Sequence, residues 1–303
     1  MRFTVFTPAY NRGYIIEQLY ESLCRQTFRD FEWIVVDDGS TDNTEEVMQR
    51  LMARENFFPI IYKKQPNGGK HRAWNRGVEL ASGGLFFGCD SDDYLTDDAL
   101  EIADRIERSI PEAEKMCFAG ICGLRGHTNK TMLGTSFDGS AYMDITYLER
   151  EKNHIVGDKT EILYTGVWRK YPYPEFEGEN FLTEAIGLLQ MADDGLKMRF
   201  FNEIVKYTEY LQDGLTANSL SRFISSPQGY GLYIHQQIEH DLLRGKRKWR
   251  AVANYYNQCQ SRLGLKTTAE YLHMNPVEVI AISKAMLLAW RVEGIADRIK
   301  RNR

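Results

Sequence analysis

The first hundred residues alternate between short apolar runs and longer segments in which apolar residues recur every three or four positions. Short apolar runs bounded by glycine, proline or polar residues are typical of buried strands, whereas the wider spacing is typical of amphipathic helices. The predicted strands lie at 3–6, 31–36, 59–62 and 85–89. The predicted helices lie at 15–23, 42–51, 70–81 and 96–106. This alternation predicts an α/β fold with a parallel, doubly wound sheet, right-handed crossovers and helices on both faces.

The pattern is less regular after residue 110. It predicts a fifth strand at 116–121, a loop or hairpin at 123–139, a helix at 181–192 and a late strand at 200–207. Two prolines make the segment 171–180 irregular. From about residue 216 the chain is largely helical, and it ends in an amphipathic helix at 277–297. We therefore expect a first domain at 1–215 and a helical C-terminal region at 216–303.

Composition narrows the class of protein. With 43% hydrophobic and 26% charged residues, the 303-residue chain has an ordinary globular composition. Its formal net charge of −4 and its pI of about 5.9 argue against nucleic-acid binding, which usually requires a strongly basic domain. Five cysteines without metal-ligand or CxxC spacing fit a reducing, cytoplasmic compartment. Neither a signal peptide nor a membrane-spanning helix is predicted.

Two basic segments lie in the helical region, the run at 244–250 and the C-terminal residues at 298–303. Together with the amphipathic last helix, they are typical of peripheral contact with anionic lipid at the inner face of a membrane. The simpler interpretation is a solvated surface, and both interpretations stay open at the level of the sequence.

Three predicted strands end in polar loops, at 7–11, 37–42 and 90–93. The carboxyl ends of parallel strands meet at one edge of a sheet, and this edge is where ligands of open α/β folds bind. We therefore expect the three loops to converge on one site.

The third of these loops carries three aspartates, Asp90, Asp92 and Asp93, directly after an apolar strand. Like charges so close repel one another, and a hard cation such as Mg²⁺ or Mn²⁺ would neutralise them and hold a diphosphate. The alternative is a solvated acidic turn that caps the next helix, because Asp is a common cap and turn former.

Five motifs span the first domain: TPAYN at 7–11, QTF with DFE at 26–32, VDDGSTD at 36–42, NGG with AWNRG at 67–77, and DSDD at 90–93. In this order and approximate spacing they resemble family 2 glycosyltransferases with the GT-A fold. The resemblance implies transfer of a sugar, with inversion at the anomeric carbon, from a nucleotide-sugar donor to a hydroxyl of a saccharide or lipid-linked saccharide. It also implies a nucleotide-binding half at 1–110, an acceptor half at 111–215, and a role in cell-surface polysaccharide or glycoconjugate synthesis.

The same resemblance assigns roles to residues near the sheet edge. It implies that Thr7, Pro8 and Tyr10 line the nucleoside site and that Asp38 accepts a hydrogen bond from the base. A carboxylate acceptor suits the N3–H group of uracil, which favours a UDP donor. Turn formation or helix capping is the alternative role for Asp38.

In the acidic cluster, the family's DXD pattern corresponds to residues 90–92. It places Asp90 near the ribose or the donor sugar and Asp92 on the metal, with Asp93 as the second metal candidate. Among the basic residues that follow the glycine turn, Arg72 is the preferred nucleotide contact, because a ligand anion would explain positive charge at a helix start. A solvated helix face is the alternative for that residue.

An inverting transfer needs a general base that removes the proton of the acceptor hydroxyl. The family places an Asp of a Glu-Asp pair at the start of a helix, and the matching register here puts Glu184 at that position, with Gln190 where Arg is common. Because the residues at 178–180 resemble the same motif in another register, Glu179 is the alternative base. The competing interpretation for either carboxylate is a favourable interaction with the positive end of a helix dipole.

Two other functions are compatible with the sequence. A protein that retains the fold could bind nucleotide sugars without catalysis. A nucleotidyltransferase shares the sheet and the metal, but it would carry a Gly-rich basic loop after its first strand, whereas residues 7–12 contain one arginine. The sequence does not identify the oligomeric state.

Overall fold

The structure, a computed structural model, describes residues 1–128, 131–208 and 219–301. The chain divides into two compact units. The first unit contains Met1–Glu175 and Gly187–Ala217, and the second contains Phe176–Ile186 and Asn218–Arg303. The domain boundary that the sequence predicts near residue 215 lies outside the described residues.

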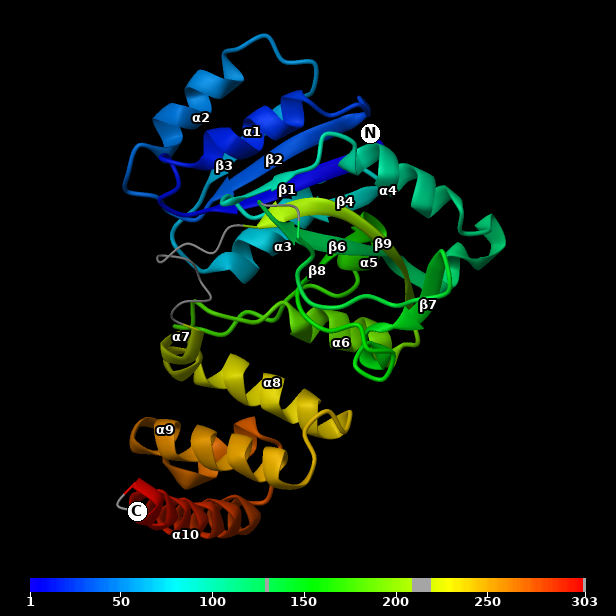
Figure 1. The fold of residues 1–303 in the computed structure, drawn as a ribbon. Helices are drawn as coiled ribbons and strands as arrows, with labels where there is room; N and C mark the ends of the chain where they lie inside the picture. The colour runs from blue at the N-terminus through cyan, green and yellow to red at the C-terminus, as the bar shows by residue number, and fades with distance from the viewer. Residues whose placement is uncertain (129–130, 209–218, 302–303) are drawn as a thin grey trace. The chain divides into compact units, whose positions relative to one another are not determined.

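Four parallel strands form the first half of the sheet in the first unit (Figure 1). They lie in the order β3 (Ile60–Lys64), β2 (Phe31–Asp37), β1 (Phe3–Ala9) and β4 (Leu85–Gly88). Apolar residues fill β1 and β2 because both strands are buried on both faces, as in other parallel sheets. The predicted α/β alternation and the four parallel strands are therefore confirmed.

The second half of the sheet is mixed, which the sequence pattern does not predict. Strand β8 (Lys159–Tyr164) runs antiparallel to β4, and β6 (Phe118–His127) runs antiparallel to β8. Strand β9 (Lys197–Thr208) is parallel to β6, and the short strands β5 (Asp93–Leu95) and β7 (Tyr142–Thr146) pair antiparallel with β9. The order along the sheet is β3-β2-β1-β4-β8-β6-β9-β5.

Two predicted boundaries differ from the structure. The predicted fifth strand is preceded by a 3-10 helix at Glu112–Cys117, and β6 continues to His127, into the segment where a loop or hairpin is expected. Helix α6 (Ala185–Asp193) begins four residues later than predicted. A second 3-10 helix, Tyr147–Glu149, follows β7.

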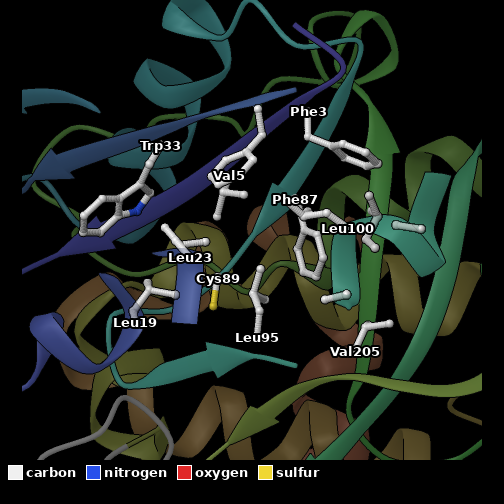
Figure 2. Close-up of a cluster of buried hydrophobic side chains, with 14 of the residues drawn as sticks. Phe3, Val5, Leu19, Leu23, Trp33, Phe87, Cys89, Leu95, Leu100 and Val205 are labelled. Carbon is white, nitrogen blue, oxygen red and sulfur yellow. The ribbon is translucent and has the colours of Figure 1, made fainter. Parts of the chain in front are cut away.

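Helices cover both faces of the sheet. The helices α1 (Ile16–Cys24), α2 (Thr44–Met52) and α4 (Ala99–Arg108) pack on one face. Figure 2 shows apolar side chains of α1 and α4 against those of the strands. The labelled members of this core are Phe3, Val5, Leu19, Leu23, Trp33, Phe87, Cys89, Leu95, Leu100 and Val205.

The opposite face of the sheet is aromatic. Helix α3 (Lys70–Leu80) packs there through Trp74, whose ring lies 5.2 Å from the ring of Phe6 and 5.5 Å from that of Phe86. Trp168 of the short helix α5 (Thr165–Trp168) contacts the same indole at 5.5 Å. Alternate residues of β1 and β4 therefore contribute to two separate cores.

The second unit is helical. It contains α7 (Ser219–Ser225), α8 (Pro227–Glu239), α9 (Gly245–Tyr271) and α10 (Pro276–Arg301). Its apolar core includes Ile234, Val252, Tyr255, Leu272, Val279 and Met286. Among the described residues, no helix combines the length and the apolar character needed to cross a membrane.

The close approach of α3 to β1 requires a glycine. A Cβ at Gly77 would lie 2.2 Å from the Phe6 ring, whereas a Cβ at Gly166 of α5 would meet no atom within 4 Å. We expect Gly77→Ala to lower the free energy of unfolding by about 2 kcal/mol, because overpacking outweighs the gain in helix propensity. Chemical denaturation of Gly77→Ala and of the control Gly166→Ala would measure this. Equal stability of the two variants would contradict the packing.

Candidate active site

The loops after β1 and β2 are held together by hydrogen bonds. The side-chain Oδ1 of Asn11, a residue with φ of 53°, accepts hydrogen bonds from the backbone N–H groups of Thr41 (2.8 Å) and Asp42 (3.3 Å). The backbone N–H of Asn11 donates to Ser40 Oγ at 2.9 Å, and that of Gly13 donates to Asp42 Oδ2 at 3.1 Å. The predicted convergence of these two loops at one sheet edge is therefore confirmed.

Asp38 connects this edge to the start of α3. Its Oδ1 accepts hydrogen bonds from Gln65 Nε2 (2.9 Å) and the Gly68 N–H (2.9 Å), and its Oδ2 accepts one from the Gly69 N–H (2.7 Å). The residue is 4% exposed. The carboxylate thus holds a glycine turn that lies about thirty residues away in the sequence. Sequence patterns for turns and helix caps are local, so they do not predict this contact. Recognition of a base by Asp38 stays a prediction.

The residues expected to line a nucleoside site differ in exposure. Thr7 has no exposed surface, and its Oγ1 accepts a hydrogen bond from Trp33 Nε1 at 3.0 Å, inside the core. The side chain of Thr7 therefore points into the core, and a nucleoside contact by this residue stays a prediction. Pro8 is partly buried and Tyr10 is 47% exposed, so these two residues present surface at the edge.

The basic residues at the start of α3 have different partners. Lys70 Nζ lies 2.6 Å from Asp90 Oδ1. Arg72, the residue preferred from the sequence, instead donates from Nη1 to the Gly68 carbonyl (2.6 Å), and its Nε lies 3.3 Å from a carboxylate oxygen of Glu175. Lys70, rather than Arg72, is thus the basic residue paired with the acidic cluster.

The acidic cluster is partly neutralised by the protein itself. Asp90 pairs with Lys70, and Asp93, which is 3% exposed, pairs with Lys206 of β9 at 3.3 Å. Burial alone raises the pKa of Asp90, but the charges of Lys70, Lys206 and Arg125 outweigh it and hold that pKa well below its usual value. The argument that adjacent carboxylates need an added cation therefore fails for Asp90. For Asp93, burial raises the pKa more than the charge of Lys206 lowers it, so this carboxylate is compensated only in part. Asp93 is nearly fully buried and paired with Lys206, whereas metal binding by Asp93 stays a prediction.

Asp92 is the remaining carboxylate. It is partly buried, it makes no ion pair among the described residues, and burial together with the charges of Asp90 and Asp93 raises its pKa to about 6. Such an uncompensated carboxylate fits a hard divalent cation. Within the described part of the chain, no group of three or more His, Cys, Asp or Glu side chains is arranged to hold a metal. A metal at Asp92 would therefore need oxygen ligands from a substrate, which is usual for Mg²⁺.

The two candidate bases belong to the second unit, whereas the acidic cluster belongs to the first. Glu179 is 5% exposed, and its carboxylate oxygens accept hydrogen bonds from the backbone N–H groups of Gln228 (2.7 Å) and Gly229 (2.9 Å). These are N–H groups of the first turn of α8, which have no partner within the helix. Glu179 therefore caps α8. Glu184 directly precedes α6 and is partly exposed, so it is the better candidate for a base.

Comparison with known proteins finds a family match within the N-terminal part of the first unit. Residues 4–130 match the family described as Glycosyl transferase family 2. The chondroitin synthase of Pasteurella multocida (strain Pm70) is 40% identical over 99 residues, which are 33% of this chain and 10% of that protein. The chain therefore matches about a tenth of the length of this relative.

Two solved structures resemble most of the chain. TarS 1-349 from S. aureus in complex with UDP aligns with a TM-score of 0.57 at 21% identity, over 86% of this chain and 72% of that one. The mannosyltransferase PcManGT from Pyrobaculum calidifontis, in complex with GDP-Man and Mn²⁺, aligns with a TM-score of 0.53 at 17% identity, over 96% and 75% of the two chains. At these identities the likeness shows the fold, and the predicted GT-A fold with a helical C-terminal region is confirmed.

The raised pKa of Asp92 predicts that this residue destabilises the ligand-free protein. An acid whose pKa is raised on folding costs stability above the folded pKa, and the cost disappears as the pH falls below the unfolded pKa. We expect Asp92→Asn to increase the free energy of unfolding by about 1–2 kcal/mol at pH 7, and to have no effect below about pH 4.

Denaturant titrations at several pH values would measure this gain. The matched control is Asp90→Asn, which removes the partner of Lys70 and a carboxylate whose pKa is held low, so we expect this variant to lose about 1–2 kcal/mol of stability at pH 7. If Asp92→Asn lowered stability at pH 7, the assignment of Asp92 as the uncompensated carboxylate would be overturned.

The capping contact of Glu179 predicts a structural phenotype. In Glu179→Gln, one acceptor oxygen is replaced by an amide group that cannot accept the N–H of α8, so we expect a loss of about 1–3 kcal/mol. Thermal or chemical denaturation measures the loss. Glu177→Gln, an exposed change in the same segment, should alter stability by less than about 0.5 kcal/mol. Similar values for the two variants would argue against the cap.

Proposed function

Because residues 4–130 match glycosyl transferase family 2, we propose that the protein transfers a sugar from a nucleotide-sugar donor to an acceptor hydroxyl. One observation carries this proposal: the segment that matches the family is also the segment that forms the candidate site at the edge of the sheet. The matched segment contains the hydrogen-bonded loops after β1 and β2, the glycine turn held by Asp38, and the acidic cluster after β4.

The donor in this proposal is a UDP-sugar, bound at the carboxyl ends of β1 and β2. Pro8 and Tyr10 present surface there, and Asp38 holds the adjacent turn. The carboxylate of Asp38 retains acceptor capacity, because each of its oxygens has two lone pairs and three of the four are used. Binding of UDP by the structurally similar TarS supports this donor class.

Metal dependence is proposed from the chemistry of Asp92. Asp92 would hold Mn²⁺ or Mg²⁺ together with the diphosphate of the donor, and the Mn²⁺ complex of the similar mannosyltransferase supports this. When bound, the metal would neutralise the charge that develops on the departing nucleoside diphosphate. Lys70 is a further positive group beside this position, and Asp90 holds its ammonium group at 2.6 Å.

The general base in the proposal is Glu184. As the acceptor oxygen forms a bond to the anomeric carbon and the bond from that carbon to the diphosphate breaks, the hydroxyl proton would move to the Glu184 carboxylate. Attack from the face opposite the leaving group inverts the configuration. Glu179 is less suited to this role because both of its oxygens accept N–H groups of α8.

We place the reaction in polysaccharide or glycoconjugate synthesis, with a saccharide or lipid-linked saccharide as acceptor. The similarity to a chondroitin synthase supports a polysaccharide product. Peripheral contact with anionic lipid at the cytoplasmic face belongs to the same proposal. It is supported by the exposed basic residues Lys246, Arg247 and Arg250 around Trp249, which is 46% exposed.

A panel of nucleotide sugars, assayed with Mn²⁺ and saccharide acceptors, tests the proposed function. We expect Asp92→Ala to abolish transfer and to weaken UDP binding. Glu184→Gln should lower the transfer rate by about a hundredfold or more while leaving UDP binding nearly unchanged, because a base acts on the acceptor rather than on the donor. Glu177→Gln serves as the control and should retain wild-type rates.

Each result has a distinct meaning. If Glu184→Gln kept most of the wild-type rate, the assignment of the base would be wrong. If the wild-type protein bound UDP with Mn²⁺ but transferred no sugar to any acceptor, the protein would be a nucleotide-sugar-binding protein without catalysis.

A further inference from the structure

Lys206 is a buried lysine beside the acidic cluster. Its side chain is 2% exposed, although lysine is rarely buried without a charged partner. The ammonium Nζ lies 3.3 Å from Asp93 Oδ2 and donates a hydrogen bond to the Gly88 carbonyl at 3.3 Å. Lys206 thus contacts the residue at the end of β4 and the residue at the start of β5.

These two contacts flank the turn that carries Asp90 and Asp92. Within the turn, the Asp93 N–H donates to the Asp90 carbonyl at 3.0 Å, and the Cys89 N–H donates to the Phe6 carbonyl at 2.8 Å. After the turn, β5 pairs with β9, with Leu95 opposite Lys206. The turn is therefore anchored to β1 before it and to β9 after it, and the ammonium group joins both ends.

We propose that Lys206 is a positioning residue that holds the 88–93 turn so that the Asp92 carboxylate faces the donor diphosphate. The inference deepens the proposed function and depends on it for the role of Asp92. It assigns Asp93 to this support, as the buried counterion of Lys206. Asp93 is nearly fully buried and its carboxylate is paired with Lys206, so in this proposal it supports the turn through Lys206.

The charge of Lys206 is essential to this role. A buried ion pair is often replaceable by apolar residues when both partners are changed together, whereas loss of one partner leaves an uncompensated buried charge. Removal of the ammonium alone would therefore force Asp93 to seek water or a proton, and the turn would move with it. Removal of both charges should restore part of the order.

Lys159 provides a matched control. It is also 2% exposed and lies in the first unit, at the start of β8. Its ammonium donates to the carbonyls of Val156 (2.9 Å) and Leu133 (3.3 Å) rather than to the acidic cluster. Lys159→Met and Lys206→Met thus delete similar buried ammonium groups, but only the second touches the turn.

Hydrogen exchange measured by mass spectrometry on the ligand-free protein tests the position of the turn directly. We expect Lys206→Met to accelerate exchange of the amides at 89–95 by about tenfold or more relative to the wild-type protein. Lys159→Met should leave the exchange rates of these amides unchanged, even if its melting temperature falls as much as that of Lys206→Met. If Lys206→Met does not fold, Asp93→Asn removes the same pair from the other side and should give the same exchange pattern.

Binding of UDP in the presence of Mn²⁺, measured by calorimetry, tests the consequence for the site. The dissociation constant should rise by about tenfold in Lys206→Met and stay within about twofold of the wild-type value in Lys159→Met. In the double variant Lys206→Met/Asp93→Asn it should recover in part, because the effects of mutating two residues that contact each other are not additive. Unchanged exchange and binding in Lys206→Met, or equal changes in Lys159→Met, would overturn the inference.

The two proposals can fail separately. If the wild-type protein binds no UDP with Mn²⁺ and transfers no sugar, the proposed function fails. The exchange data then still decide whether Lys206 holds the turn.

Discussion

Compensation of buried negative charge at the carboxyl end of β4 is the constraint on which the site depends. Three aspartates follow a strand that is buried on both faces, so each must be paired, hydrated or neutralised. The chain provides cations from two different elements, Lys70 at the start of α3 and Lys206 in β9. One carboxylate, that of Asp92, is left without an ion pair among the described residues, and this asymmetry is why we propose Asp92 as the ligand-binding position.

Aromatic packing holds the same region from the other side of the sheet. Trp74 of α3 contacts Phe6 and Phe86, and its ring lies so close to Gly88 that a Cβ there would be 2.2 Å from the indole. The last residue of β4 is thus confined between an indole and the ammonium group that binds its carbonyl. Dispersion and electrostatic contacts therefore act on one residue, directly before the acidic turn.

The sequence pattern predicts those helices, strands and loops that are determined by neighbouring residues. It does not predict contacts between residues that are far apart in the sequence. Strands β1, β2 and β4 are evident because parallel strands are continuous apolar runs, and DSDD is evident because its acids are adjacent. Strand β5 is three residues long and charged, so no periodicity identifies it. Lys206 and Lys70 look like ordinary solvated lysines in the sequence, and their pairing with Asp93 and Asp90 emerges only from the fold.

Thr7 and Asp38 show the same limit within motifs that the sequence does identify. The motif around Thr7 lies at the sheet edge where we propose the site, but strand alternation turns this side chain into the core, against Trp33. The motif around Asp38 is also at the edge, yet its carboxylate is engaged by a glycine turn. A family motif therefore indicates where a site lies more reliably than it indicates which side chains contact the ligand.

The pairing of β5 with β9 has a consequence for synthesis on the ribosome. The β3-β2-β1-β4 half of the sheet is complete once roughly ninety residues have emerged, but the counterion of Asp93 is encoded more than a hundred residues later. During elongation, at about 5–20 residues per second, the nascent chain carries an acidic turn with no counterion from β9 for several seconds. The acidic turn therefore acquires its counterion from β9 only when nearly all of the first unit has been synthesised.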